Sequence, residues 1–91
     1  MIVARHYVVV GRVQGVGFRF FVRDAARREG LTGWVRNREE GSVEIEAQGD
    51  ADALQRFEMS VRQGPRSARV DDVIVDSAPI SDSRRDFVIE P

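Results

Sequence analysis

Nine residues of the chain, GRVQGVGFR at positions 11–19, combine unusual backbone freedom with a single cation. Gly15 and Gly17 permit left-handed backbone angles that other residues avoid, so consecutive amides can point into one concavity. Arg19 follows at the start of a helical pattern, where unpaired N–H groups and a partial positive charge favour anions. Because a guanidinium holds oxyanions with paired hydrogen bonds, these residues favour a site for an anion such as phosphate.

The spacing of these residues also permits a simpler interpretation, in which the glycines only turn the chain and Arg19 is a solvated surface residue. The stretch matches neither GxxxxGK[ST] nor GxGxxG, so no nucleotide-binding motif decides between the two. Gly11 precedes the pair, and we expect it to let the chain leave the preceding strand.

Composition narrows the possible chemistry. The 91 residues include no cysteine, which excludes disulfides, thiolate nucleophiles and zinc sites built on sulfur. All 14 basic residues are arginine, so no lysine is available for a Schiff base. His6, the only histidine, falls at strand spacing among apolar neighbours, and we expect an ordinary strand residue there. A net charge of −1 argues against a nucleic-acid binder driven by bulk charge.

The hydrophobic pattern predicts two amphipathic helices. Apolar residues recur at helical spacing from Phe18 to Ala26, and Gly30 is a suitable residue just past the end of that helix. Asp50 is placed to cap a second helix with an apolar stripe from Ala51 to Val61, which Gly64-Pro65 would stop. No apolar run approaches the length of about 20 residues that a membrane span needs, and no signal peptide is evident, so we expect a cytoplasmic protein.

Strand patterns surround these helices. β-Branched and aromatic residues or period-2 alternation mark strands at 2–10, 31–37, 42–48, 68–76 and 87–89. The inward parity of the fourth shifts between Val70 and Val73, which predicts a β-bulge near Asp71-Asp72. The order predicts an α+β, ferredoxin-like βαββαβ sandwich, with two helices on one face of an antiparallel sheet and a short extra C-terminal strand. We expect one domain, 1–91.

Two motifs resemble the signatures of the acylphosphatase family, small enzymes that hydrolyse the carboxyl–phosphate bond. The first is GRVQGVGFR, and the second is GWVRN at 33–37 followed by the turn REEGSVE. Glu40 stands where the family more commonly has aspartate, which concerns the turn rather than the chemistry. Further similarities are Gly64-Pro65 and a terminal F-x-I at 87–89, so the resemblance covers essentially the whole chain.

This resemblance implies a role for each motif. Arg19 corresponds to the catalytic, phosphate-binding arginine, and Asn37 to the asparagine that holds the attacking water. The amides of the first motif correspond to the phosphate cradle, formed by Gln14, Gly15, Val16, Gly17, Phe18 and Arg19. Phosphoryl transfer needs mainly positioning and charge stabilisation, so we expect a metal-free, cofactor-free hydrolase. Its expected partner is a small-molecule acyl phosphate, with no nucleic acid and no membrane, and we expect a monomer.

Three alternatives remain at this point. Asn37 precedes a glycine-containing turn, where asparagine often serves turn chemistry alone. The same topology also occurs in modules that stack nucleic-acid bases on strand aromatics, although Glu44 and Glu46 on the outer side of strand 42–48 would repel phosphates. A third alternative is a carbamoyl-phosphate domain of the kind fused to hydrogenase maturation factors. Those domains sit in long chains, whereas we expect this one to be complete from Met1 to its final strand.

Overall fold

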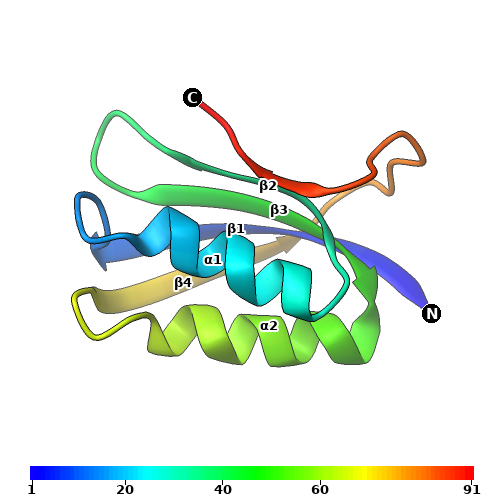
Figure 1. Ribbon diagram of the computed structural model, residues 1–91, viewed down its shortest axis with the longest axis horizontal. Coiled ribbons are helices and arrows are strands. Elements are labelled where there is room, and N and C mark those ends of the chain that lie inside the picture. Colours follow the sequence, from blue (N-terminus) through cyan, green and yellow to red (C-terminus); the bar gives the residue numbers. More distant parts are fainter.

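The strands and helices follow the predicted order, with two helices covering one face of a single sheet (Figure 1). The computed structural model describes residues 1–91. The elements are β1 (Ile2–Arg12), α1 (Phe18–Arg28), β2 (Thr32–Asn37), β3 (Val43–Asp50), α2 (Ala51–Gln63), β4 (Arg69–Ser77) and β5 (Phe87–Ile89). This arrangement confirms the predicted α+β, ferredoxin-like fold. Neither helix is long and apolar enough to cross a bilayer.

The strands lie in the order β4-β1-β3-β2-β5. Each pair of neighbours among β4, β1, β3 and β2 is antiparallel, as predicted, whereas the short β5 pairs parallel to β2 and makes the sheet mixed. Both β1 and β2 run antiparallel to β3, so they run parallel to each other on either side of it. Their C-terminal ends therefore reach the same end of the sheet, where the two motifs meet.

The core lies between the sheet and the helices. Alternate residues of the central strands point inward, among them Tyr7, Val9, Ile45 and Val35, all fully buried. Each helix buries the apolar stripe that its sequence predicts, and the fully buried residues of these stripes are Val22, Ala26, Leu54, Phe57 and Val61. The ring of Tyr7 meets that of Phe57 edge to face, with centroids 5.8 Å apart, a favoured arrangement of aromatic rings.

The three predicted helix ends are confirmed, and α2 stops at Gln63, directly before Gly64-Pro65. The carboxylate of Asp50 accepts a hydrogen bond from the Asp52 N–H at the start of α2. At the end of α1, the Gly30 N–H donates to the Arg27 carbonyl and the Leu31 N–H donates to the Ala26 carbonyl. This pair of bonds is a Schellman motif, and the buried Leu31 anchors the chain as it enters β2.

The predicted β-bulge is also present, but it changes the role of Gly11. Val10 pairs with Asp72 while Gly11 pairs with Val70, so Asp71 is the extra residue of β4. Strand β1 continues through Arg12 instead of ending at residue 10, and the expectation that Gly11 releases the chain from the strand is wrong. A β-carbon at position 11 would collide with the Arg69 carbonyl oxygen, so this glycine permits close approach of the two backbones.

Tyr7 supplies a test of this core that depends on pH. Burial and the nearby charge of Glu58 raise the pKa of its phenol to about 12, and the hydroxyl makes no hydrogen bond. The folded pKa lies above the unfolded value of about 10. The stability that the neutral Tyr7 phenol contributes to the folded state is therefore fully present below pH 10 and is lost as the pH rises toward 12.

We expect Tyr7→Phe to remove this alkaline loss and to leave the protein equally or more stable at pH 8, since the hydroxyl is buried without a partner. Urea unfolding at several pH values measures both effects. Tyr7 is the only tyrosine, so the ultraviolet absorbance of tyrosinate reports its titration directly. An equal alkaline loss in both proteins would contradict the assignment.

Candidate active site

The loop between β1 and α1 has the geometry of an anion cradle. Gly15 and Gly17 have φ values of 71° and 77°, and every non-glycine residue has a negative φ. The sign of φ therefore alternates from Gln14 to Phe18, the pattern that turns successive amides into one concavity. None of the N–H groups from Gln14 to Arg19 donates a hydrogen bond to another protein group. We call residues 14–19 the cradle.

Arg19 lies in the first turn of α1 at the end of the cradle, and its side chain is half-buried. It makes no hydrogen bond and no ion pair. Most other arginines of the chain contact a carboxylate; these are Arg23, Arg27, Arg36, Arg38, Arg56, Arg62, Arg69 and Arg84. Arg19 is thus one of six arginines without a carboxylate partner, and it is the one that lies in the first turn of α1 beside the free amides.

Asn37 is the last residue of β2, at the same end of the sheet as the cradle. It shares the strand parity of Gly33 and Val35, both buried, so its side chain lies on the face that the helices cover. Its Oδ1 atom is buried and has no hydrogen-bond partner in the protein. A buried acceptor without a partner is costly, and a water molecule is the simplest group that could satisfy it.

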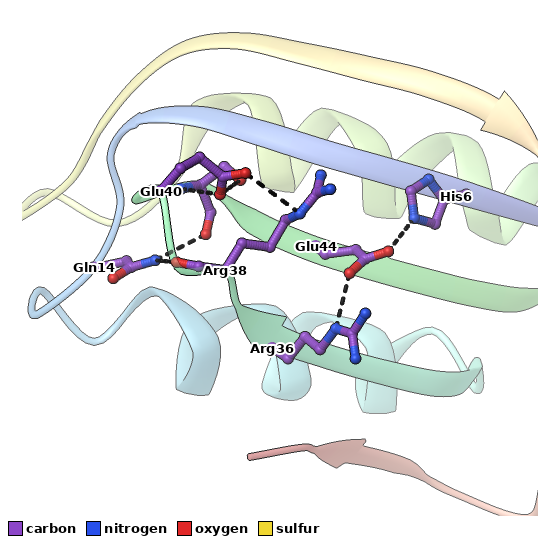
Figure 2. Close-up of polar contacts among 7 residues, drawn as sticks. His6, Gln14, Arg36, Arg38, Glu40 and Glu44 are labelled. Atoms are coloured by element: carbon purple, nitrogen blue, oxygen red, sulfur yellow. Dashed lines mark hydrogen bonds and ion pairs between the residues drawn. The ribbon is translucent and has the colours of Figure 1, made fainter.

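The cradle and the turn after Asn37 are tied together by one side chain (Figure 2). The Nε2 of Gln14 donates to the carbonyl oxygens of Arg38, at 2.7 Å, and Ser42, at 2.9 Å. The turn is closed in addition by a bond from the Arg38 N–H to the Ser42 carbonyl. Both N–H donors of the Gln14 side-chain amide are used, so this side chain supports the turn. Only the backbone N–H of Gln14 is free for the cradle.

Two acidic residues of the β2–β3 hairpin, Glu40 and Glu44, have hydrogen-bond partners of their own. A hydrogen bond from the Ser42 hydroxyl, helped by the charge of Arg38, holds the pKa of Glu40 below its usual value. Burial raises the pKa of Glu44, but hydrogen bonds from His6 and Arg36 outweigh it and the net pKa is lowered (Figure 2). Glu44 lies on the outer face of the sheet, away from Asn37.

A shallow hollow of about 370 Å³ opens beside Asn37, and its lining is polar or charged apart from Pro91; the other lining residues are 36–40. A larger hollow of about 440 Å³ lies at the other end of the sheet, around Ile2, Gly49 and Arg84. It belongs to neither motif. No group of three or more histidine, aspartate or glutamate side chains is placed to hold a metal ion.

The structure thus brings the cradle residues and Asn37 to one end of the sheet, as the motifs predict. Sequence reasoning missed the bridging role of the Gln14 side chain and the part played by Ser42, which is 6 % exposed and closes the turn. The position of Ser42, directly before the alternating apolar residues of β3, could have indicated that it belongs to the turn that begins this strand. Ser67, whose hydroxyl contacts the cradle, was missed as well, and no local pattern distinguishes it.

Comparison with known proteins adds independent information. A family model described as Acylphosphatase matches residues 5–89. An acylphosphatase from Koribacter versatilis is 49% identical over 86 residues, which cover 94% of this chain and 78% of that protein. The crystal structure of acylphosphatase from Bacillus subtilis superposes with a TM-score of 0.93 at 41% identity, covering both chains completely. Full-length HypF matches at a TM-score of 0.88 and 29% identity, with only 12% of that chain covered.

Gln14→Glu tests the tie between the two halves of the site. The variant would direct a carboxylate toward the two carbonyl oxygens that Gln14 now satisfies, so we expect a loss of about 1–3 kcal/mol in the free energy of unfolding. Urea denaturation at pH 7 measures it. Gln55→Glu, at an exposed position of α2, is the matched control and should change stability little. Equal effects at positions 14 and 55 would show that the bridge does not hold the loop.

Proposed function

This chain belongs to the acylphosphatase family of hydrolases, and on that premise we propose that the cradle, Arg19 and Asn37 form its active site. There it would hydrolyse the carboxyl–phosphate bond of a small acyl phosphate to a carboxylate and inorganic phosphate. The observation that carries this assignment is the half-buried guanidinium of Arg19, with no acidic partner, directly after a run of backbone N–H groups without acceptors.

The charge on the phosphoryl group accounts for the composition of the cradle. In phosphoryl transfer, negative charge is spread over three equatorial oxygens, and the enzyme acts mainly by positioning and electrostatic stabilisation. The N–H groups of residues 14–19 and the guanidinium of Arg19 supply donors that need not reorganise during the reaction. The N-terminus of α1 adds its partial positive charge at the same place.

Asn37 is assigned to the attacking water. Its buried Oδ1 can accept a hydrogen bond from the water, which orients the oxygen lone pair toward phosphorus. The water oxygen forms the new bond to phosphorus, the bond from phosphorus to the carboxyl oxygen breaks, and the carboxylate leaves with the electron pair. The water proton passes to solvent. A carboxylate is a good leaving group, so the step needs no strong base.

Three expectations from the sequence extend this proposal. We propose that the chain acts as a monomer, that it works in the cytoplasm, and that residues 1–91 are one domain. All the elements pack on one sheet around one core, which supports the last of these. The first two stay predictions.

Arg19→Gln is the most direct test of the anion site. The wild-type protein should hydrolyse benzoyl phosphate in the presence of excess EDTA, with competitive inhibition by inorganic phosphate. Since one preorganised donor in such a site is worth about 10²–10³ in rate, Arg19→Gln should lower kcat/KM by at least that factor with an unchanged unfolding curve. Arg28→Gln, on the exposed side of the same helix, is the control. Loss of wild-type activity with EDTA would refute the metal-free mechanism.

Asn37→Ala separates water positioning from substrate binding. We expect kcat to fall by about 10² or more while KM and the inhibition constant of phosphate change by less than about threefold, since the lost contact is to the water and not to the phosphate. Steady-state kinetics with benzoyl phosphate give all three constants. A defect mainly in KM would show that Asn37 binds substrate instead.

A further inference from the structure

We propose that Ser67 is a positioning residue for the cradle: its hydroxyl holds the Val16–Gly17 peptide in the one orientation that presents the Gly17 N–H to the bound phosphate. The inference rests on the proposed function, because it assumes that the cradle binds a phosphoryl group. It assigns a role in that site to the loop between α2 and β4, which neither sequence motif includes.

The contact that carries this inference joins two loops far apart in the sequence. The Ser67 Oγ donates a hydrogen bond of 2.7 Å to the carbonyl oxygen of Val16. Ser67 sits in a tight turn closed by a bond from the Ala68 N–H to the Pro65 carbonyl, so its position is well defined. Ser67 itself is exposed and could be solvated equally well by water. Burial therefore does not explain why its hydroxyl is bound to the cradle.

Because the peptide bond is planar, the hydrogen bond from Ser67 to the Val16 carbonyl also fixes the direction of the Gly17 N–H. The Val16 carbonyl and the Gly17 N–H belong to one trans peptide unit, so they point in opposite directions. With the carbonyl held toward Ser67, the N–H must point away from the α2–β4 loop. If the peptide rotated by half a turn, the carbonyl oxygen would take the place of the N–H. Its partial negative charge would then repel the phosphate oxygens.

Gly17 makes such a rotation easy. The rotation changes ψ of Val16 and φ of Gly17, and glycine accepts positive and negative φ about equally well. Gly17 now has φ 77°, and a β-carbon there would touch nothing within 4 Å, so the space beside its Cα is open. The flexibility of Gly17 that suits it to the cradle also permits the rotated peptide, which would not bind phosphate. The hydroxyl of Ser67 is the one side-chain contact that favours the binding form.

The α2–β4 loop keeps its place without this hydroxyl. The backbone at Gly64 lies close to the Phe18 ring, since a β-carbon built there would be 3.4 Å from Cε1 of Phe18 and 3.1 Å from Cγ2 of Val70. Phe18 is buried and Val70 packs against the core. Removal of the Ser67 hydroxyl should therefore free one peptide without displacing the loop, and Ser67→Ala should fold normally.

Ser67→Ala is expected to raise both KM for benzoyl phosphate and the inhibition constant of inorganic phosphate by about threefold to tenfold, the range that one neutral hydrogen bond provides. The value of kcat should stay within about twofold, since bound substrate selects the competent orientation. Ser67→Thr, which keeps the hydroxyl, should restore both constants. Ser83→Ala, at an exposed serine that bonds only to Ser81, is the control and should match the wild type.

Amide NMR gives a second readout that a merely structural role would not move. Phosphate should shift the Gly17 amide proton downfield to the same value at saturation in all three proteins, because bound phosphate selects one orientation of the peptide. Ser67→Ala should need about threefold to tenfold more phosphate than the wild type or Ser67→Thr to reach that value. Unchanged KM and inhibition constant in Ser67→Ala, or a loss confined to kcat, would overturn this inference alone. If the wild type itself neither hydrolyses benzoyl phosphate nor binds phosphate, the proposed function fails instead.

Discussion

An anion site built from backbone amides requires that those amides be left unpaired by the fold that surrounds them. In this chain the requirement is met where β1 has ended and α1 has not yet formed its first internal hydrogen bond, so a run of N–H groups has no acceptor. The alternating φ values at the glycines turn these groups to one side. Arg19 adds a full charge at the same point because no carboxylate neutralises it. The rest of the proposed site is organised around these unsatisfied donors.

Such a loop needs external support, since glycines do not hold one conformation by themselves. Two polar side chains provide it from opposite sides: Gln14 binds the carbonyls of the β2–β3 turn, and Ser67 binds the Val16 carbonyl. Both contacts are made to carbonyl groups and so leave the amides free. On the outer face of the sheet, Glu44 is hydrogen-bonded to His6 and Arg36. This carboxylate therefore does not compete for Arg19.

Much of this structure can be predicted from the sequence, because local patterns determine it. The helix ends at Asp50 and Gly30 and the bulge in β4 follow from short-range chemistry, and the two motifs place Arg19 and Asn37. The parallel pairing of β5 with β2, the length of β1 and the role of Gly11 depend on contacts with distant backbone, which no local pattern records. The same applies to Gln14, whose amide could have faced solvent, and to the exposed Ser67. The catalytic roles proposed for Arg19 and Asn37 come from the family resemblance.

The central position of β3 has a consequence for how the protein acquires its activity. The cradle follows β1 and Asn37 ends β2, and these strands are joined only through β3, which pairs Ile2 with Asp50. The pairing of Ile2 with Asp50 closes the long segment of chain between them, which is entropically costly and tends to slow folding. A chain that has formed its helices and the β2–β3 hairpin would still lack half of the proposed site. Recovery of enzyme activity during refolding should therefore be among the last signals to appear, later than the far-ultraviolet signal of the helices.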